Sequence, residues 1–311
     1  MTEFHHVSVL LEECIDGLNI KPNGIYVDGT LGGAGHSSRI AAKLTTGRLI
    51  GIDRDEIALA AAARRLEPYK DRVTLVHSNF CEIALVLKQL HIDGVDGVLL
   101  DLGVSSPQLD DGSRGFSYMA DAPLDMRMDN TDTLTAATVV NTWPYEELKR
   151  ILYDYGEERY APQIASAICR KREQKPIATT LELVDVIRSA MPPAALREKQ
   201  HPAKRSFQAI RIAVNDELGA VEKVMRDAVP CLNPGGRLAV ITFHSLEDRI
   251  VKNAMAEAAR GCTCPPNFPV CVCGKKPKVK LITRKPIVSG DEELEVNPRA
   301  RSAKLRICEK L

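Results

Sequence analysis

Short apolar runs alternate with longer amphipathic stretches along the first hundred residues. Runs of strand length cover residues 25–27, 48–52, 73–77 and 95–100, and amphipathic stretches of helix length cover residues 36–44, 56–66 and 80–90. Alternating units of this length imply right-handed crossovers between parallel strands. The pattern therefore predicts an α/β domain with a doubly wound, mostly parallel sheet and helices on both faces.

The alternation stops at a thirty-residue segment, Asp101 to Asn130, which is rich in Gly, Ser, Pro and Asp and has no clear period. A loop of this length is usually functional or leads into an insertion. Helical patterns alone follow, over 145–155, 161–172 and 180–190, and Pro192 and Pro193 end the last of them. We predict a sheet domain over 1–105 and 215–311 and a helical insertion over 106–214.

The sheet pattern returns after the insertion. We expect a single long helix over 207–229, a Pro-Gly-Gly turn into a strand at 237–243, a helix at 246–259, and two edge or hairpin strands at 279–283 and 303–307. The last two runs alternate apolar with basic or polar residues, as strands with one solvated face do. The sheet should therefore close with an antiparallel pair.

Four glycines follow the first strand, in the order Gly29, Gly32, Gly33 and Gly35, before an alanine-rich helical pattern. A strand, a glycine turn and a helix N-terminus let the backbone approach a ligand closely and offer it N–H groups. The GxGxxG spacing is met only loosely and GxxxxGK[ST] does not occur, so a P-loop triphosphate site is not expected. Dinucleotides and S-adenosylmethionine both remain compatible with the turn.

Asp53 ends the second strand about twenty residues beyond the glycines, where a carboxylate can accept hydrogen bonds from two ribose hydroxyls. The alternative is that it only caps the helix starting near Asp55. The fifth-strand sequence NPGGRLAVITF is similar to that of class I methyltransferases, and no hydride-relay His with an anion-binding Arg is evident. These features favour a methyl donor over a nicotinamide.

Two further side chains could contact the donor. His36 follows the glycine turn and either donates to a ligand carboxylate or lies on the surface. Phe80 follows the third strand and either stacks on an adenine or packs in the core, the commoner fate of a single Phe.

Asp101 is the strongest catalytic candidate because it lies at the carboxyl end of the fourth strand, where open α/β sheets bind their ligands. The following Ser105-Ser106-Pro107-Gln108 partly resembles the motif of amino-group methyltransferases, which has an acid, Asn or Ser, two prolines and an aromatic. Such a site must accept N–H protons from a weakly nucleophilic exocyclic amine and align it with the methyl group. Aromatic residues available to hold an unstacked base, or to pack, are Phe116, Tyr118 and Phe243.

The net charge of +1, from 42 basic and 41 acidic residues, means that any affinity for nucleic acid must come from local patches. Residues 196–211 hold five basic residues and one acid, and residues 275–285 hold six basic residues and no acid. We expect salt-sensitive phosphate contacts there, with solvated surface as the alternative. The chain shows no export signal and no long apolar run, so we expect a cytoplasmic protein that does not contact membranes.

Four of the nine cysteines cluster as C-x-C, six residues, C-x-C: Cys262, Cys264, Cys271 and Cys273. Four thiols at this spacing in a reducing compartment suggest a structural tetrahedral Zn²⁺ site. The C-x-C spacing leaves a tighter turn between two metal-binding thiols than the usual C-x₂-C does. Free or oxidation-prone thiols are therefore the alternative.

With these residues identified, the chain resembles, over nearly its whole length, the family of bacterial 16S ribosomal RNA cytosine-N4 methyltransferases called RsmH or MraW. The resemblance rests on long motifs in one order, including YVDGTLGGAGHS, GIDRD, LLDLGVSSPQLDDGSRGFSY, HPAKRSFQAIRIAVNDEL and PGGRLAVITFHSLEDRIVK. It implies a class I fold with a helical insertion that recognises RNA. It also implies methylation of N4 of one cytidine, position 1402 in standard bacterial numbering, in the small ribosomal subunit.

Carried over by motif, the resemblance assigns the donor to these residues: Ala34, Gly35, His36, Asp53, Phe80, Asp101 and Gln108. Ala34 departs from the usual glycine, which is harmless at negative φ and unfavourable at positive φ. The cysteine cluster is not shared by all members. Methyltransferases acting on DNA or protein amines and a non-catalytic ribosome-assembly protein are the rival functions, and whether the chain is a homodimer stays open.

Overall fold

The computed structural model describes residues 8–105, 108, 111–262, 264, 270 and 273–311, and its chain divides into two compact units. Unit 1 comprises residues 1–103 and 218–311, and unit 2 comprises residues 104–217. The boundaries predicted from the sequence lie two and three residues from this division.

Unit 1 contains one seven-stranded sheet in the order β3-β2-β1-β4-β5-β7-β6. The strands are β1 (Ile25–Asp28), β2 (Arg48–Asp53), β3 (Val73–His77), β4 (Val95–Asp101), β5 (Leu232–Thr242), β6 (Val279–Leu281) and β7 (Lys304–Lys310). The first five are parallel, whereas β7 pairs antiparallel with both β5 and β6. The predicted α/β class, parallel sheet and antiparallel closing pair are therefore confirmed.

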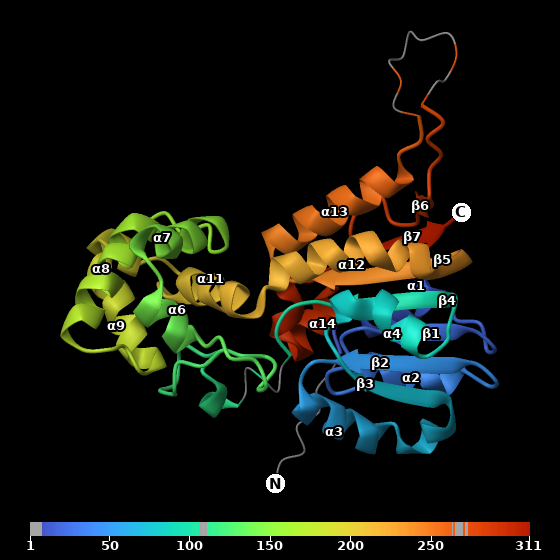
Figure 1. Ribbon diagram of the computed structural model, residues 1–311, viewed down its shortest axis with the longest axis horizontal. Helices are drawn as coiled ribbons and strands as arrows, with labels where there is room; N and C mark the ends of the chain where they lie inside the picture. The colour runs from blue at the N-terminus through green and yellow to red at the C-terminus, as the bar shows by residue number, and fades with distance from the viewer. Residues whose placement is uncertain (1–7, 106–107, 109–110, 263, 265–269, 271–272) are drawn as a thin grey trace. The chain divides into compact units, whose positions relative to one another are not determined.

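Helices cover both faces of this sheet (Figure 1). The helices and 3₁₀ turns of unit 1 are α1 (Leu11–Leu18), α2 (Gly35–Lys43), α3 (Glu56–Arg65), η1 (Glu67–Arg72), η2 (Phe80–Glu82), α4 (Ile83–Gln89), α12 (Glu217–Cys231), α13 (Ser245–Ala259), α14 (Asp291–Val296) and η4 (Pro298–Ser302). Alternate residues of β4 enter different apolar clusters: Val98 and Leu100 pack with α4, α12 and α13, and Leu99 packs with α1, α2 and α3. The continuous apolar run of β4 is explained by this burial on both faces.

Unit 2 is helical and has an apolar core of its own. Its elements are η3 (Gly112–Arg114), α6 (Ala136–Thr142), α7 (Tyr145–Asp154), α8 (Ala161–Gln174), α9 (Thr180–Ala190), α10 (Pro193–Leu196) and α11 (Lys204–Asn215). Pro192 and Pro193 follow the end of α9 as predicted, and Pro193 also begins α10, where its missing N–H costs nothing.

The single helix predicted over 207–229 is wrong, because α11 and α12 are separate helices. Asp216 between them has a left-handed backbone with φ of 45°, a conformation that Asp tolerates better than most residues. The buried Asn215 side chain accepts from the Met128 N–H at 2.8 Å and donates to the Met126 carbonyl at 2.8 Å. These hydrogen bonds tie the end of α11 to the loop after η3 and explain why an unbroken apolar period does not give one helix.

Two other boundaries also differ from the prediction. The stretch 80–90 begins as the 3₁₀ turn η2, because Asn79 caps the Cys81 N–H, and α4 starts only at Ile83. The Pro-Gly-Gly turn lies inside β5, where the register with β4 shifts between Leu232 and Arg237 and Gly235 takes a φ of 76°.

Candidate functional site

Three carboxylates end neighbouring parallel strands at one edge of the sheet of unit 1. Asp28 ends β1, Asp53 ends β2 and Asp101 ends β4. The carboxyl ends of parallel strands in an open sheet form the crevice in which such folds bind ligands. The predicted residues Asp53 and Asp101 are therefore joined by an acid, Asp28, that the sequence reasoning had not singled out.

The glycine turn between β1 and α2 packs tightly against this edge. The Gly29 N–H donates to the Leu99 carbonyl at 2.9 Å, and a Cβ on Gly29 would lie 2.6 Å from Leu100 Cδ2. A Cβ on Gly35, the first residue of α2, would lie 1.7 Å from Ser8 Oγ, whereas one on Gly33 would meet nothing within 4 Å. Gly33 thus borders open space, and the N-terminus of α2 with its N–H groups lies two residues further on.

Ala34 precedes α2 with φ of 58° and ψ of 32°, in the left-handed region. This is the alternative that is unfavourable for an alanine. The conformation costs an L-residue roughly 1–2 kcal/mol. The Ala34 methyl group is fully buried in the apolar cluster beneath α2, which offsets part of that cost.

Both oxygens of Asp53 accept backbone hydrogen bonds. Oδ2 accepts from the Gly32 N–H at 2.8 Å and Oδ1 accepts from the Asp55 N–H at 2.9 Å. The N-cap of α3 is Asp55, whose carboxylate accepts from the Ile57 N–H at 3.0 Å, so the alternative in which Asp53 caps this helix is wrong. Asp53 instead joins the end of β2 to the glycine turn, and burial raises its pKa.

His36 is buried, so the surface alternative for this residue is also wrong. Its Nε2 lies 3.0 Å from the Val9 carbonyl oxygen, and its Nδ1 lies 3.8 Å from Asp101 Oδ2. Because a carbonyl oxygen can only accept, the Nε2–H donates to the Val9 carbonyl, and Nδ1 faces the Asp101 carboxyl. The structure therefore brings two of the predicted residues, His36 and Asp101, together.

Asp101 has an unusual electrostatic environment. Burial, together with the nearby carboxylates of Asp28 and Glu247, raises its pKa to about 8. Its Oδ1 is buried and has no hydrogen-bond partner within the described part of the chain, whereas its backbone N–H donates to Thr30 Oγ1 at 2.6 Å. An unpartnered acceptor among acids is a position that a cationic ligand or an N–H donor would stabilise.

The two neighbouring acids are held by their own contacts. Asp28 accepts from Ser37 Oγ at 2.7 Å and from the Thr30 N–H at 3.2 Å, and burial raises its pKa to about 6 against the effect of these two bonds. Glu247 in the first turn of α13 is buried and accepts from the Phe243 N–H at 2.9 Å. The signal that could have identified Asp28 is its place at a strand end, the same as that of Asp53 and Asp101.

The aromatic candidates lie in different surroundings. Phe80 is half-buried and packs against the core near Gly29, and Phe243 is half-buried at the end of β5. In unit 2, Phe116 is buried in the helical core, which leaves it no face for a base. Tyr118 stacks on His201 with ring centroids 4.5 Å apart.

Several predicted residues are not placed at this edge. Ser106, Pro107 and Cys271 lie outside the described residues. Gln108 belongs to unit 2, where its side chain is buried and accepts from the Ser105 N–H at 3.1 Å.

The basic run of unit 2 divides into two kinds of side chain. Arg211 forms a bidentate ion pair with Glu217 at 2.7 and 2.9 Å, so two N–H groups of its guanidinium already donate within the protein. Arg197, Lys199 and Lys204 are exposed. Phosphate contacts therefore remain a prediction for the exposed members of the run and not for Arg211.

The strand order, the antiparallel seventh strand, the glycine turn and the acids at the strand ends together define a class I methyltransferase. The model of the MraW methylase family matches residues 3–311, and the chain belongs to this family.

Curated relatives are similar over almost the full chain. Ribosomal RNA small subunit methyltransferase H of Brevibacillus brevis is 61% identical over 99% of this chain and 98% of its own length. The protein of the same name from Heliobacterium modesticaldum is 58% identical over 99% of each chain. Among solved structures, a putative rRNA-methylase from Clostridium thermocellum covers 98% of this chain and 100% of its own at 13% identity, with a TM-score of 0.45. Within the described residues, no helix is both long and apolar enough to cross a membrane.

Proposed function

We propose that this protein transfers a methyl group from S-adenosylmethionine to the exocyclic N4 amine of a cytidine in small-subunit ribosomal RNA, position 1402 in standard bacterial numbering. The observation that carries the proposal is the sequence identity of 56–61% to relatives named ribosomal RNA small subunit methyltransferase H, over nearly the whole chain. The acids at the strand ends of unit 1 supply the chemistry that this reaction needs.

The residues at the crevice fit the donor. The glycine turn permits close backbone approach, and the N-terminus of α2 offers N–H groups to the carboxylate of the donor. The remaining lone pairs of Asp53 can accept from the ribose hydroxyls, and the half-buried Phe80 would contact the adenine. The unpartnered Oδ1 of Asp101, beside Asp28, favours the positive charge of a sulfonium.

The bound donor supplies an electrophilic methyl group, and the chain's own residues would orient and deprotonate the acceptor. As the new N–C bond forms and the S–C bond breaks, the amine becomes more acidic and must lose a proton. The Asp101 carboxylate, whose raised pKa makes it a better proton acceptor than an ordinary Asp, can take it. Ser106 and Pro107, which lie outside the described residues, are assigned to the amine only by the partial motif resemblance.

His36 would act on Asp101. Its Nε2–H bond to the Val9 carbonyl fixes the ring so that Nδ1 stays 3.8 Å from the carboxyl of Asp101.

Unit 2 would recognise the RNA, and the natural acceptor would be the rRNA within the 30S subunit in the cytoplasm. Exposed lysines and arginines of residues 197–205 are suited to the phosphate backbone, and each such contact would add to the salt dependence of binding. Lys204 and Arg205 begin α11, and Arg205 also donates to the Glu157 carbonyl at 2.7 Å.

The direct test is transfer of labelled methyl from S-adenosylmethionine to 30S subunits purified without the modification, with the product nucleoside identified by mass spectrometry. We expect N4-methylated cytidine at one site. Naked 16S rRNA, DNA and protein serve as competing acceptors. Methyl transfer only to DNA or protein would contradict the proposed acceptor, and donor binding without transfer to any of them would favour the non-catalytic alternative.

The RNA contacts have a separate test. Lys204→Ala with Arg205→Ala should weaken binding to the subunit and reduce its salt dependence by up to two phosphate contacts, without altering donor affinity. The matched control is Lys149→Ala with Arg150→Ala in α7, which removes the same charge from side chains already paired with Glu146 and Glu147. Equal effects of the two double variants would refute a specific role for the start of α11.

A further inference from the structure

The connection from α13 to β6, residues 260–278, is held together at its base. The Lys278 N–H donates to the Ala258 carbonyl at 2.8 Å, and the Lys275 ammonium pairs with the Glu257 carboxylate. The chain therefore leaves α13 and returns to the same place. A connection of this length needs either apolar packing or a cross-link to hold one conformation.

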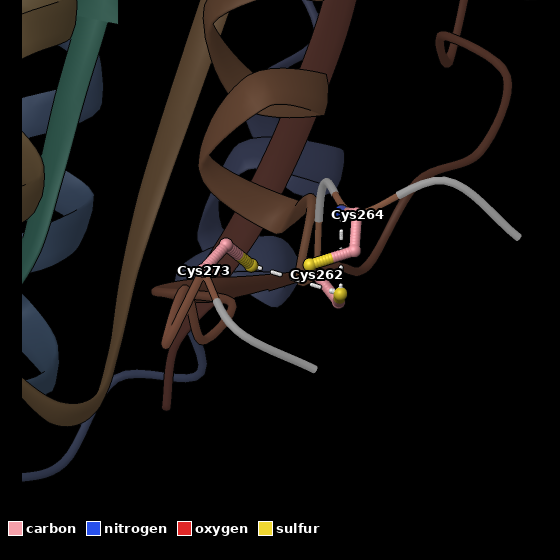
Figure 2. A group of neighbouring side chains, drawn as sticks. All are labelled: Cys262, Cys264 and Cys273. Carbon is pink, nitrogen blue, oxygen red and sulfur yellow. Dashed lines mark hydrogen bonds between the residues drawn. The ribbon is translucent and has the colours of Figure 1, made fainter. Parts of the chain in front are cut away.

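Three thiols from the two legs of this loop converge just beyond its base (Figure 2). Cys262 and Cys264 lie on the leaving leg and Cys273 lies on the returning leg, with all three sulfur atoms within 4.8 Å of one another. The Sγ atoms of Cys262 and Cys273 are 3.6 Å apart, and the Cys264 N–H points to Cys262 Sγ at 3.4 Å.

This spacing matches a metal site better than a disulfide. With Zn–S bonds of about 2.3 Å, two ligands at the corners of a tetrahedron are separated by about 3.8 Å. The Sγ–Sγ distance of 3.6 Å is close to that edge, whereas a disulfide needs about 2.05 Å. The thiols of Cys262 and Cys273 therefore already have the separation that a shared zinc ion requires.

The surroundings favour the same chemistry. Cys262 and Cys273 are exposed, so their convergence is not explained by burial in an apolar core. The basic residues Lys275, Lys276 and Lys278 follow Cys273 directly, and nearby cations stabilise the thiolate form that binds metal. An N–H donating to Cys262 Sγ is also a contact that stabilises a metal-bound thiolate.

We propose that Cys262, Cys264 and Cys273 bind one Zn²⁺, which fixes the two legs of the loop. Each thiol loses its proton to solvent as it binds. A fourth protein ligand or a water molecule completes the tetrahedron, and Cys271 lies outside the described residues. The site is structural, because the fifteen residues of α13 place it about 22 Å from the start of that helix, where Glu247 borders the acidic crevice.

The metal content of the full-length chain tests the proposal. Protein purified under reducing conditions without chelator should contain about one zinc per chain, and Cys262→Ser with Cys273→Ser should lower this to below about one tenth. The matched control, Cys169→Ser with Cys231→Ser, removes two half-buried thiols from other parts of the chain and should keep the zinc. Replacement by Co²⁺ should give the thiolate charge-transfer absorption and the intense visible bands of a tetrahedral site.

A second measurement reads the loop itself. Chelation should accelerate tryptic cleavage after Arg260 and Lys275 in the original chain. It should not change the cleavage rate in the Cys262→Ser, Cys273→Ser variant, which lacks two of the proposed zinc ligands. Folded protein with no zinc and no Co²⁺ bands would overturn the proposal. So would a disulfide between Cys262 and Cys273 in the reduced preparation, which would identify a redox pair instead.

Discussion

Replacing Asp101 by Asn should make the donor-free protein more stable while it abolishes methyl transfer. The wild-type carboxyl has a pKa of about 8 in the fold, against 3.8 when unfolded. At pH 7 the folded carboxyl keeps its proton whereas the unfolded one has lost it, so folding must take up a proton at a cost of up to about 4 kcal/mol, from three pH units at 1.36 kcal/mol each. Because 24% of the side chain is exposed and solvent screens its charge, we expect about half of this, ~2 kcal/mol. Asn has the same shape and no charge to bury.

The sign of the pH dependence follows from the raised pKa. Between the two pKa values the folded state binds more protons at this group than the unfolded state does, so the free energy of unfolding falls as the pH rises from about 4 to about 8. The Asn variant lacks this pH-dependent contribution to the free energy of unfolding. The gain in stability should therefore be small near pH 4 and largest near pH 8.

The assay is urea unfolding of both proteins near pH 5, pH 7 and pH 8, followed by circular dichroism. The single tryptophan, Trp143, lies in unit 2, and its fluorescence reports that unit separately. Asp96→Asn is the control on the same strand, because Asp96 has a lowered pKa: burial raises it, but hydrogen bonds from the Ile25 N–H and from Lys21 outweigh this. It should lose about 1 kcal/mol. An Asp101→Asn variant that is no more stable than wild type at pH 8 would refute the electrostatic reasoning.

Three further outcomes are expected. Binding of S-adenosylmethionine, measured by calorimetry, should tighten as the pH rises from about 6 to 8, because the sulfonium favours ionised Asp101. Binding of the product, whose thioether sulfur is uncharged, should depend less on pH. An equal pH dependence for both ligands would contradict the charge argument. Gly35→Ala should destabilise the fold and weaken donor binding, because the added Cβ would overlap Ser8 Oγ, whereas the control variant Gly33→Ala should fold normally. Equal unfolding midpoints for the two variants would be inconsistent with this packing. Ala34→Gly should change the free energy of unfolding by less than about 1 kcal/mol. Glycine relieves the strain of the positive φ, but the variant loses the buried methyl group and its unfolded chain is more flexible. A change of several kcal/mol would contradict this balance of effects.

Local pattern was enough to predict most of the sheet and part of the site. The strand β3 and the helix α9 have the predicted limits, Val73–His77 and Thr180–Ala190, because burial on a fixed period and flanking turn residues define such elements from nearby sequence. The acids Asp53 and Asp101 could be found in the same way, since strand ends at one edge of a parallel sheet must converge.

Tertiary contacts decided what the pattern left open. The break between α11 and α12 depends on hydrogen bonds from Asn215 to Met126 and Met128, almost ninety residues away in the chain, which no local period records. The raised pKa of Asp101 likewise comes from its burial and from Asp28 and Glu247, which belong to another strand and to a helix after the insertion. Sequence therefore determined which elements form and which residue types end them, because these follow from contacts a few positions apart. The state of the site was decided only by folding, because burial and charge depend on residues that are distant in the chain.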